Sequence, residues 1–367
     1  MFIQKILLNN FRNFLSADFT VGEGINIFWG GNGSGKTSAL EAINYLSQAR
    51  SFRTTKNSSI INYAAKELTV YSEILSRETN MVSKLGITRD VKGNVCAKIN
   101  GRILNRVADL AQNICVQTII PNGLTLLEAG PGFRRSFIDW GCFYHFNNFF
   151  DINSGFRKIL KQRNILLSSK NVDEDYFNLW NRSFVEYSIE LSKIRIEYLN
   201  VFNKYANNYI LKLLPDLTIN MELIPGHKMD VDDFMLQVKN HYKREIMMGY
   251  SLIGPHKADL NIKTNNKNSV DSLSRGQQKL LIVALKLAQG IVFQTITKNN
   301  CIFLIDDISS ELDNNSLNKL YDLIDSLSSN NQFFITCLHN DFPKFQNSKA
   351  KMFHVEHNSI IEQELFI

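Results

Sequence analysis

Eight consecutive residues near the N-terminus have the types and spacing of a phosphate-binding loop. The loop consists of Gly30, Gly31, Asn32, Gly33, Ser34, Gly35, Lys36 and Thr37, and it satisfies the pattern GxxxxGK[ST] in full. Glycines allow such a backbone to wrap a phosphate chain, and backbone N–H groups at the start of the following helix attract anions. In this pattern Lys36 reaches the outer phosphates and Thr37 ligates Mg²⁺. The sequence therefore predicts that this loop holds the phosphates of a nucleotide.

Two adjacent carboxylates could complete the metal side of that site. Residues 301–305, CIFLI, are an apolar run typical of a strand buried on both faces, and Asp306 and Asp307 follow it directly. Ligands of open α/β sheets bind at the carboxyl ends of the strands. We expect Asp306 to hold Mg²⁺ through water and Asp307 to polarise an attacking water, which would make Asp307 catalytic.

A polar segment precedes the apolar helix that is predicted after residue 274. Residues 273–277 read LSRGQ, in which Ser274 and Gln277 form the pattern of a capping box. Capping does not explain Gly276, a poor helix former, unless another group closely approaches the backbone there. Ser274, Gly276 and Gln277 would also suit a terminal phosphate, because a helix N-terminus presents unpaired N–H groups and a positive dipole end.

Composition limits the class of protein. A chain of 367 residues exceeds one ordinary core, which predicts two domains. The formal charge of +6 permits contact with a polyanion but does not demonstrate one. The five cysteines predict reduced core thiols, and the histidines show no spacing typical of zinc ligands. Because the sequence has no signal-peptide pattern and no uncharged run of about 18 residues, we expect a cytoplasmic protein.

Periodicity and turn signals indicate the elements that position these residues. We expect strands at 2–11, 24–30, 259–264, 301–307, 332–338 and 351–356, and short antiparallel strands within 60–105. We expect helices at 156–167, 176–214 as one helix or two, 315–328, and directly after residues 30–37 and 273–277. The α/β elements at both ends of the chain predict a discontinuous lobe I, residues 1–130 and 246–367, with a helical lobe II at 131–245 inserted into it.

The segment LSRGQ resembles the signature motif LSGGQ of ABC-type ATPases. In those proteins the motif contacts the γ-phosphate of ATP bound to a second subunit, so the resemblance implies a homodimer that encloses two ATP molecules. Ser310 to Asp313 looks like the D-loop of the same family. The 238 residues between Lys36 and Ser274 exceed the spacing in transporter subunits and leave no room for a long coiled coil. The implied fold is an α/β ABC-type P-loop ATPase head of mixed sheets and helices with an inserted helical lobe.

Within these ATPases the chain resembles the RecF family of bacterial replication and recombinational repair proteins. The matching stretches are residues 10–13, 30–37, 40–43, 51–53, 134–141, 160–164, 254–260 and 273–277. The resemblance implies an ATP-dependent DNA-binding protein, with a function in DNA damage and the SOS response, that clamps double-stranded DNA at gap junctions as a homodimer. It also implies cooperation with the mediators RecO and RecR in loading a recombinase.

Some residues depart from the wider ABC pattern. Asp307 stands where many of these ATPases have Glu, which favours slow, DNA-stimulated hydrolysis in a protein that acts mainly as an ATP-controlled switch. The usual switch histidine is absent, and Thr336 or His339 could take its place. Gln117 is the candidate for the metal-contacting Q-loop glutamine.

Two basic clusters could contact DNA. They are Arg50, Arg53 and Lys56 after the P-loop helix, and Arg157, Lys158, Lys161 and Arg163 in lobe II. By composition each cluster is equally typical of a solvated surface, but the family resemblance favours contacts to the DNA backbone, which carry no base information. Arg134 and Arg135 could instead brace the junction of the lobes.

Two other kinds of protein also contain a P-loop ATPase of this type and are alternative interpretations. A transporter ATPase subunit is disfavoured by the motif spacing and by the absence of a signature for a membrane partner. A nuclease-coupled ATPase head would need metal-binding carboxylates beyond Asp306 and Asp307.

Overall fold

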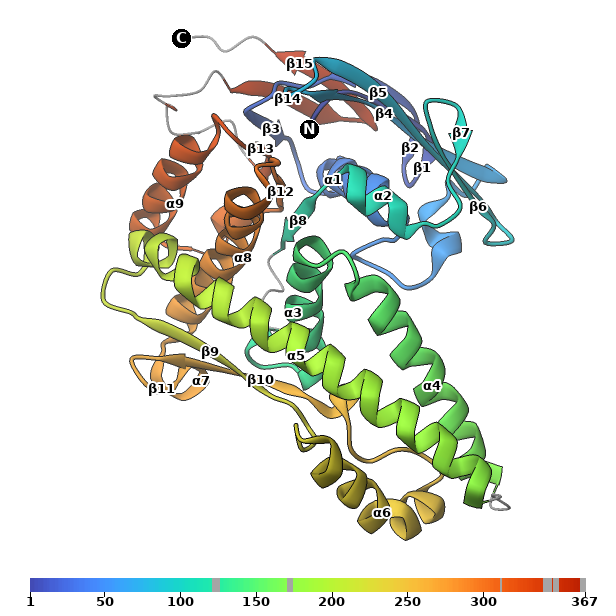
Figure 1. Cartoon of the computed structure of the whole chain (residues 1–367). Coiled ribbons are helices and arrows are strands. Elements are labelled where there is room, and N and C mark those ends of the chain that lie inside the picture. Colours follow the sequence, from blue (N-terminus) through green and yellow to red (C-terminus); the bar gives the residue numbers. More distant parts are fainter. Residues whose placement is uncertain (121–125, 170–173, 311, 339–344, 346–349, 364–367) are drawn as a thin grey trace. The chain divides into compact units, whose positions relative to one another are not determined.

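The chain forms two compact units (Figure 1). The computed structural model describes residues 1–120, 126–169, 174–310, 312–338, 345 and 350–363. Unit 1 comprises Met1–Gly123, Lys212–Pro215 and Arg275–Ile367, and unit 2 comprises Leu124–Leu211 and Asp216–Ser274. The sequence-based division placed residues 246–274 in lobe I. They belong to unit 2 because β10 (Asp259–Thr264) pairs along its whole length with β9 (Ile219–Ile224).

Unit 1 contains two six-stranded sheets. The first sheet is antiparallel, in the order β2 (Phe14–Thr20), β1 (Phe2–Phe11), β4 (Glu67–Ser76), β5 (Met81–Asp90), β6 (Val95–Ile99) and β7 (Arg102–Ile103). The second has the order β15 (Ser359–Gln363), β14 (Lys351–Glu356), β3 (Ile25–Trp29), β13 (Gln332–Cys337), β12 (Ile302–Ile305) and β8 (Val116–Ile119). From β14 to β8 all neighbours are parallel, and β15 pairs antiparallel with β14.

The helices of unit 1 cover the second sheet on both faces. They are α1 (Lys36–Gln48), α2 (Ala108–Asn113), α8 (Arg275–Thr297) and α9 (Asn314–Leu327), with short 3₁₀ turns at Asn57–Ile60 and Ile308–Ser310. Leu40 and Ile43 of α1 share one buried apolar cluster with residues from both sheets, so α1 packs between the sheets. On the other face α8 approaches so closely that a Cβ at Gly290 would lie 2.5 Å from Cζ of Phe303.

The burial of each strand explains its sequence pattern. All four residues of β12 and all six of β13 are buried, as expected for parallel strands covered by helices on both faces. In β2, buried Phe14, Ala17 and Phe19 are separated by exposed residues, which is the pattern of a strand with one face in solvent. The sequence analysis did not predict β15, because four of its five residues are exposed and it has no apolar run.

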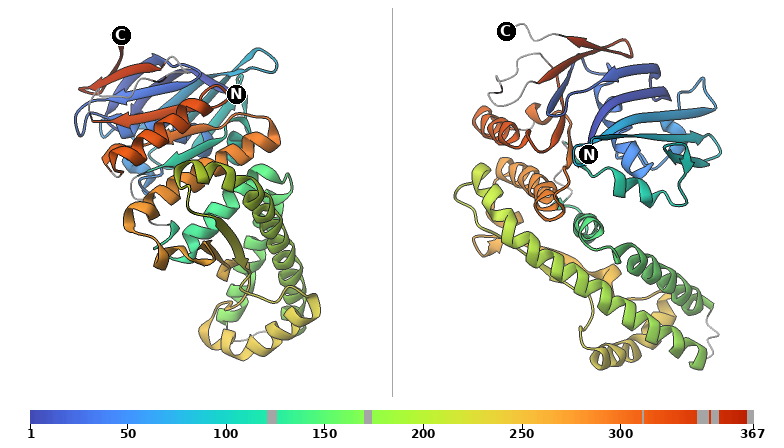
Figure 2. Two further views of the ribbon diagram at one scale, coloured as in Figure 1. Left: turned by 90° about the vertical axis from the view of Figure 1, so that its left-hand side faces the viewer. Right: turned by 45° about the horizontal axis from the view of Figure 1, so that its top comes forward.

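Unit 2 is mainly helical and includes a small sheet. Its helices are α3 (Pro131–His145), α4 (Phe149–Ser169), α5 (Glu174–Leu213), α6 (Val231–Met248) and α7 (Ser269–Ser272), with a 3₁₀ turn at Pro255–Lys257. The segment predicted at 176–214 as one helix or two is therefore a single helix, the 40-residue α5. Figures 1 and 2 show α4 alongside α5, and Phe156 packs against Phe184 between them. The sheet has the order β11 (Lys267–Asn268), β10 and β9, of which only β10 was predicted.

Helix α8 is the one helix in the described part of the chain that is long and apolar enough to cross a membrane. Its apolar window has a mean hydropathy of 1.7, and 67% of that window is buried inside the protein. Leu281, Leu285 and Ala288 are completely buried in unit 1. This burial accounts for the apolar character of α8 as a core helix.

A buried ion pair and its hydrogen bonds connect four segments of unit 2. Arg163 on α4 and Glu245 on α6 have no exposed side-chain surface, and Nη2 of Arg163 lies 2.6 Å from Oε2 of Glu245. The same guanidinium donates to Asn181 at 3.0 Å and to Ser251 at 2.6 Å. The interpretation of Arg163 as a DNA contact is therefore wrong, because the side chain is inaccessible and its donors are used inside unit 2.

Other arginines also brace unit 2. Arg134 forms a bidentate pair with Asp259 at 2.6 and 2.9 Å, which joins α3 to β10. Arg135 donates to the carbonyl oxygen of Ala258 at 2.7 Å. Arg134 and Arg135 thus act within unit 2, where all of these partners lie.

Replacing Arg163 by Ala should destabilise the protein by about 3–5 kcal/mol, because Glu245 would remain buried as an unpaired charge. Arg157→Ala on the same helix is the matched control, and its exposed position should limit the change to about 0.5 kcal/mol. Denaturant unfolding of the full chain measures both. Equal effects of the two substitutions would contradict a structural role for Arg163.

Candidate nucleotide-binding site

A cavity of about 750 Å³ in unit 1 brings the phosphate loop and the paired carboxylates together. Lys36 and Thr37 line it from the start of α1, Asp306 and Asp307 from the end of β12, and Thr336 from β13. Because β12 and β13 are parallel neighbours, their carboxyl ends meet at the same edge of the sheet. The sequence-based prediction that these residues share one site agrees with this geometry.

The backbone of the loop requires glycine at two positions. Gly30 has φ +150°, and a Cβ there would lie 2.3 Å from the carbonyl oxygen of Val355. Gly35 has φ +119°, and a Cβ there would lie 2.9 Å from Cζ of Phe14. Left-handed backbone is strained for residues that have a side chain. The conformation of residues 30–35 therefore depends on the glycine pattern of the motif.

Lys36 contacts the loop that precedes it. Its Nζ donates to the carbonyl oxygens of Gly30 at 2.6 Å and Gly31 at 2.8 Å. Burial lowers the pKa of the ammonium group, and the negative charges of Asp307 and Asp306 oppose that shift. The cation is therefore held beside the cavity by neutral carbonyl groups.

Three oxygen-bearing side chains form a compact cluster at the edge of the sheet. The Thr37 hydroxyl donates to Oδ1 of Asp306 at 3.0 Å, and the Thr336 hydroxyl donates to the same atom at 2.7 Å. Burial raises the pKa of Asp306, although both hydroxyl groups act to lower it and Asp307 acts to raise it further. Burial thus disfavours the ionised form of the Asp306 carboxylate, and a bound cation would stabilise that form.

Thr336 also orients Asp307. The backbone N–H of Asp307 donates to Oγ1 of Thr336 at 2.9 Å, and Asp307 has φ +42°, in the left-handed region that non-glycine residues seldom adopt. Strained backbone of this kind occurs preferentially at functional sites. Of the two switch candidates, Thr336 belongs to the cluster, while His339 lies outside the described residues.

The chain's own residues fit a nucleotide with Mg²⁺. Oγ of Ser34 is buried and has no hydrogen-bond partner among the described residues, so it remains available to a phosphate oxygen. The cluster offers hydroxyl and carboxylate oxygens, which are the ligands that Mg²⁺ prefers. Among the described residues, no group of three or more His, Cys, Asp or Glu side chains could form another metal site.

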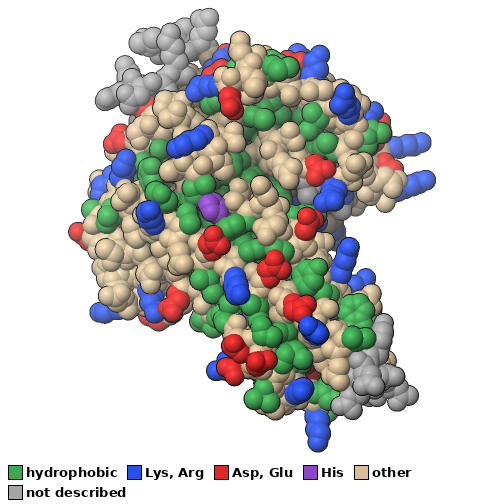
Figure 3. All heavy atoms as spheres, viewed as in Figure 1, with side chains coloured by type: hydrophobic (Ala, Val, Ile, Leu, Met, Phe, Trp, Pro, Cys, Tyr) green, Lys and Arg blue, Asp and Glu red, His purple; other side chains and the backbone are tan. Residues whose placement is uncertain are grey.

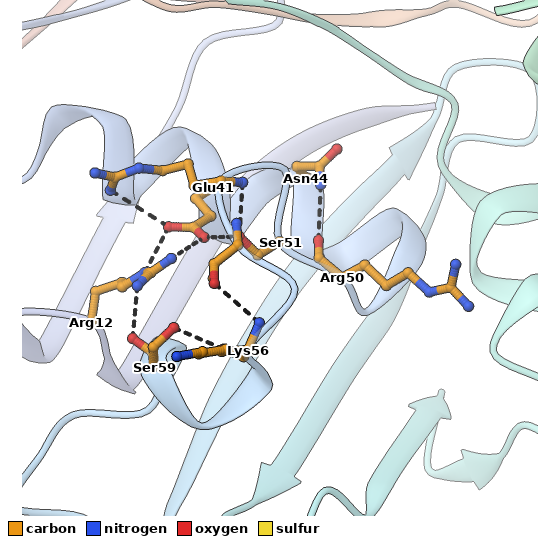
Figure 4. Close-up of polar contacts among 9 residues, drawn as sticks. Arg12, Glu41, Asn44, Arg50, Ser51, Lys56 and Ser59 are labelled. Atoms are coloured by element: carbon orange, nitrogen blue, oxygen red, sulfur yellow. Dashed lines mark hydrogen bonds and ion pairs between the residues drawn. The ribbon is translucent and has the colours of Figure 1, made fainter. Parts of the chain in front are cut away.

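Arg12 lines the same cavity, and the sequence analysis assigned it no role. Figure 4 shows its guanidinium against the carboxylate of Glu41, with N–O distances of 2.9 and 2.6 Å. Glu41 is completely buried, and Ser51 also donates to it. Arg12 was part of one matching stretch, but only the tertiary structure brings it from the turn after β1 to the cavity.

The three residues of the first predicted DNA cluster, Arg50, Arg53 and Lys56, do not share one environment in the structure. Arg53 lines the nucleotide cavity, and its Nη1 lies 3.8 Å from Oε2 of Glu41. Arg50 and Lys56 have exposed side chains and do not line the cavity. In Figure 4 the carbonyl group of Arg50 accepts from Asn44 while its side chain points away.

Gln117 is not at the metal site. It is 3% exposed on β8, and its side-chain amide donates to Oε1 of Gln289 at 2.8 Å and to the carbonyl oxygen of Lys286 at 3.3 Å. These contacts turn the amide toward α8 rather than toward the cavity. The Q-loop interpretation of Gln117 is therefore wrong.

The head of α8 is exposed. Ser274, Arg275, Gly276 and Gln277 all face solvent, and α8 begins at Arg275, directly after Ser274. A Cβ at Gly276 would meet no atom within 4 Å. Packing within this chain thus gives no reason for glycine at position 276. In the D-loop segment Glu311 lies outside the described residues, and the Asp313 carboxylate caps α9 through the N–H groups of Asn315 and Ser316.

Comparisons with known proteins agree with this geometry. A family model described as the RecF/RecN/SMC N-terminal domain matches residues 2–361. A curated relative from Mannheimia succiniciproducens, named DNA replication and repair protein RecF, is 37% identical over the full length of both chains. A relative of the same name from Pasteurella multocida is 39% identical over 85% of this chain and 86% of its own.

Solved structures extend the likeness in fold. A structure described as the recombination mediator protein RecF-ATP in the RecFOR pathway has a TM-score of 0.89, covers 99% of this chain and 98% of that one, and is 23% identical. An Smc head bound to the C-winged helix domain of ScpA has a TM-score of 0.58, 15% identity and coverage of 100% and 98%. The predicted class, an ABC-type ATPase head of mixed sheets and helices, is confirmed. The chain belongs to the RecF family of DNA replication and repair proteins.

Proposed function

We propose that the chain is an ATP-dependent DNA-binding protein in which two copies enclose two ATP molecules with Mg²⁺. The hydrogen-bonded cluster of Thr37, Asp306 and Thr336 beside the glycine loop carries this proposal. It supports a phosphate and cation site because its geometry joins the motif to the carboxylates at hydrogen-bond distance. Family membership and the full-length match favour this function over a transporter ATPase subunit.

The chain's own residues have distinct roles in that site. Lys36 neutralises phosphate charge, Ser34 and the loop N–H groups donate hydrogen bonds, and Thr37 with Asp306 positions the cation. Arg12 adds a second positive charge at the cavity, and buried Glu41 holds its guanidinium in place. The bound Mg²⁺ would spread the charge that develops on the terminal phosphate.

Asp307 is the candidate general base for slow hydrolysis. Thr336 holds the backbone of Asp307 in its left-handed conformation, which directs this residue to the cavity. Hydrolysis would then end the ATP-bound state rather than drive a chemical synthesis. The protein acts in this proposal mainly as a switch with weak, DNA-stimulated ATPase activity.

The exposed head of α8 would complete the site of a second copy. An unshielded glycine backbone and a helix N-terminus suit the terminal phosphate of a nucleotide bound elsewhere. Because packing within this chain does not use the space at Gly276, that space remains for a group from outside the chain.

Relatives supply the biological setting of the proposal. They are named DNA replication and repair proteins, and the structural neighbour is described as a recombination mediator in the RecFOR pathway. We infer that the ATP-bound homodimer clamps double-stranded DNA at gap junctions in the cytoplasm and assists RecO and RecR in recombinase loading. Contacts to phosphates would make this binding independent of base sequence.

Replacing Lys36 by Ala should weaken nucleotide binding by about 10- to 150-fold, because a charge-assisted contact contributes about 1.5–3 kcal/mol. Titration calorimetry with ATP and Mg²⁺ measures the affinity. Lys66→Ala removes an exposed lysine that does not line the cavity and should leave the affinity unchanged. An affinity of Lys36→Ala within twofold of the original would refute the assignment.

Replacing Gly276 by Ala should stabilise the fold by about 0.5–1 kcal/mol, since alanine is the better helix former. It should nevertheless weaken ATP-driven dimerisation, because the methyl group would occupy the approach to the helix head. Ser274→Asp should also prevent dimerisation by charge repulsion, although Asp caps helices as well as Ser. Sedimentation with and without ATP measures dimer formation. Dimerisation of both variants at the original level would leave the helix head with a capping role alone.

A mixture of Ser274→Asp and Lys36→Ala chains provides an internal control. A mixed dimer has one composite site with both parts intact and one with neither. It should therefore recover part of the ATP-driven dimerisation that each variant lacks alone.

Replacing Asp307 by Asn should reduce the rate of ATP hydrolysis by about 10²- to 10⁴-fold, the usual contribution of a general base. Asn tolerates the left-handed backbone and keeps the N–H bond to Thr336, so the fold and nucleotide binding should persist. The ATP-bound dimer should then accumulate on DNA. Steady-state hydrolysis and the dissociation rate of the dimer measure this, and a normal hydrolysis rate would exclude Asp307 as the base.

A further inference from the structure

One stretch of unit 1 has positive side chains and no acidic ones. Between Asp90 and Asp109 the chain contains Lys92, Lys98, Arg102 and Arg106 but neither Asp nor Glu. This segment forms β6, β7 and the turns beside them, at the edge of the first sheet. None of the residues in this segment belongs to the motifs of the nucleotide site.

Three cations lie near one end of this hairpin, Lys84 and Lys98 on one face of the sheet and Arg102 on the other. Asn100 (φ +49°) and Gly101 (φ +81°) form the two-residue turn between β6 and β7. Lys98 precedes the turn and Arg102 follows it. Lys84 on β5 lies opposite Asn100, which accepts from the Lys84 N–H and donates to the Lys84 carbonyl group, both at 2.8 Å. We call Lys84, Lys98 and Arg102 the basic turn.

The basic turn is accessible and carries an excess of positive charge. All three side chains are exposed, and none forms an ion pair with a carboxylate of the described residues. Glu73 is the cross-strand partner of Lys84, and its carboxylate accepts from the Tyr71 hydroxyl at 3.1 Å, so one acidic group lies opposite the three cations. Figure 3 shows Lys and Arg side chains projecting from the side where β5, β6 and β7 lie. Lys84 and Lys98 are like charges on one face of the sheet, which is destabilising, and a bound anion would relieve that repulsion.

The turn itself is open to a ligand. A Cβ at Gly101 would meet no atom within 4 Å, so atoms of this chain leave space around the turn backbone. The Asn100–Gly101 turn lies at the edge of the sheet, where it can approach the phosphates that border a groove of duplex DNA. Lysine and arginine side chains suit those phosphates without reading bases.

We propose that the basic turn is a contact of unit 1 with the phosphate backbone of double-stranded DNA. This inference rests on the proposed DNA-binding function and names a surface for it. It differs from the clusters predicted from the sequence, in which Arg53 adjoins the nucleotide site and Arg163 is buried.

The lobe II cluster has a different character from the basic turn. Arg157 and Lys161 line a hollow of about 480 Å³ together with Leu160 and Ile165. Apolar side chains beside cations are more typical of protein interfaces than of phosphate contacts. The basic turn is therefore the stronger candidate for DNA.

The test compares two triple variants with the same change of formal charge. The first combines Lys84→Gln, Lys98→Gln and Arg102→Gln. The matched control combines Lys239→Gln, Lys243→Gln and Arg244→Gln, which removes three exposed cations from α6. Fluorescence anisotropy measures the affinity for a duplex with ATP between about 50 and 200 mM salt, the range over which phosphate contacts weaken strongly. Calorimetric ATP binding verifies that each variant is folded.

We expect the basic-turn variant to lose at least about tenfold in duplex affinity at 0.1 M salt, and its slope of log K against log salt to flatten by about 2–3. The control variant should change both quantities little. If the basic-turn variant and the unmodified chain have equal affinity and equal slope, the basic-turn contact is refuted, but the proposed DNA-binding function is not. Equal losses in both variants would overturn it too, because net charge rather than this surface would then govern binding.

Failure of the basic-turn contact can be told apart from failure of the proposed function. An unmodified chain that does not bind duplex DNA with ATP would refute the proposed function itself. If the triple variant does not fold, Lys98→Gln and Arg102→Gln are tested singly, and each should flatten the salt slope by about 0.9. Binding to poly-glutamate is measured for the same variants. If the basic-turn variant loses this binding while its duplex affinity is unchanged, the basic turn binds an acidic protein rather than DNA, and the inference is overturned.

Discussion

The hydrogen bonds that converge on Oδ1 of Asp306 determine the geometry of the candidate site. Thr37 and Thr336 donate to this atom from the start of α1 and the end of β13, while Asp306 itself directly follows β12. The cluster thus fixes the register between the glycine loop and the central strands. It forms only because β12 and β13 are parallel neighbours whose carboxyl ends coincide. The packing of the helices on the sheets holds the start of α1 next to the carboxyl ends of β12 and β13.

The charges of the site are balanced only in part by the chain. Burial raises the pKa of Asp306 and lowers the pKa of Lys36, so both ionised forms are disfavoured where they lie. A cation beside Asp306 and phosphates beside Lys36 would favour both ionised forms. The head of α8 shows an analogous incompleteness, since nothing in this chain accounts for Gly276. Nucleotide binding and association of two copies would complete these two surfaces respectively.

Local patterns were sufficient to predict the loop, the paired carboxylates and most elements. Glycine positions and apolar runs encode these features within a few residues, so the sequence predicted α1, β12 and the α8 start. Arg12, Gln117 and Arg163 show where this reasoning fails. The partners of these three, Glu41, Gln289 and Glu245, lie 29, 172 and 82 residues away in sequence. A cation's exposure or an amide's direction depends on such tertiary contacts, which no local pattern contains. The exposed strand β15 was missed for a different reason: its local sequence has no apolar run that would indicate a strand.

We propose that Mg²⁺ and ATP at the Asp306 cluster convert the chain into a homodimer that holds DNA. Light scattering of the full chain measures its mass directly with and without ATP and Mg²⁺, in the presence and absence of duplex DNA. We expect a doubling of mass with ATP and Mg²⁺, and a further increase by the mass of the duplex. An unchanged monomer mass under conditions in which calorimetry shows ATP to be bound would contradict it.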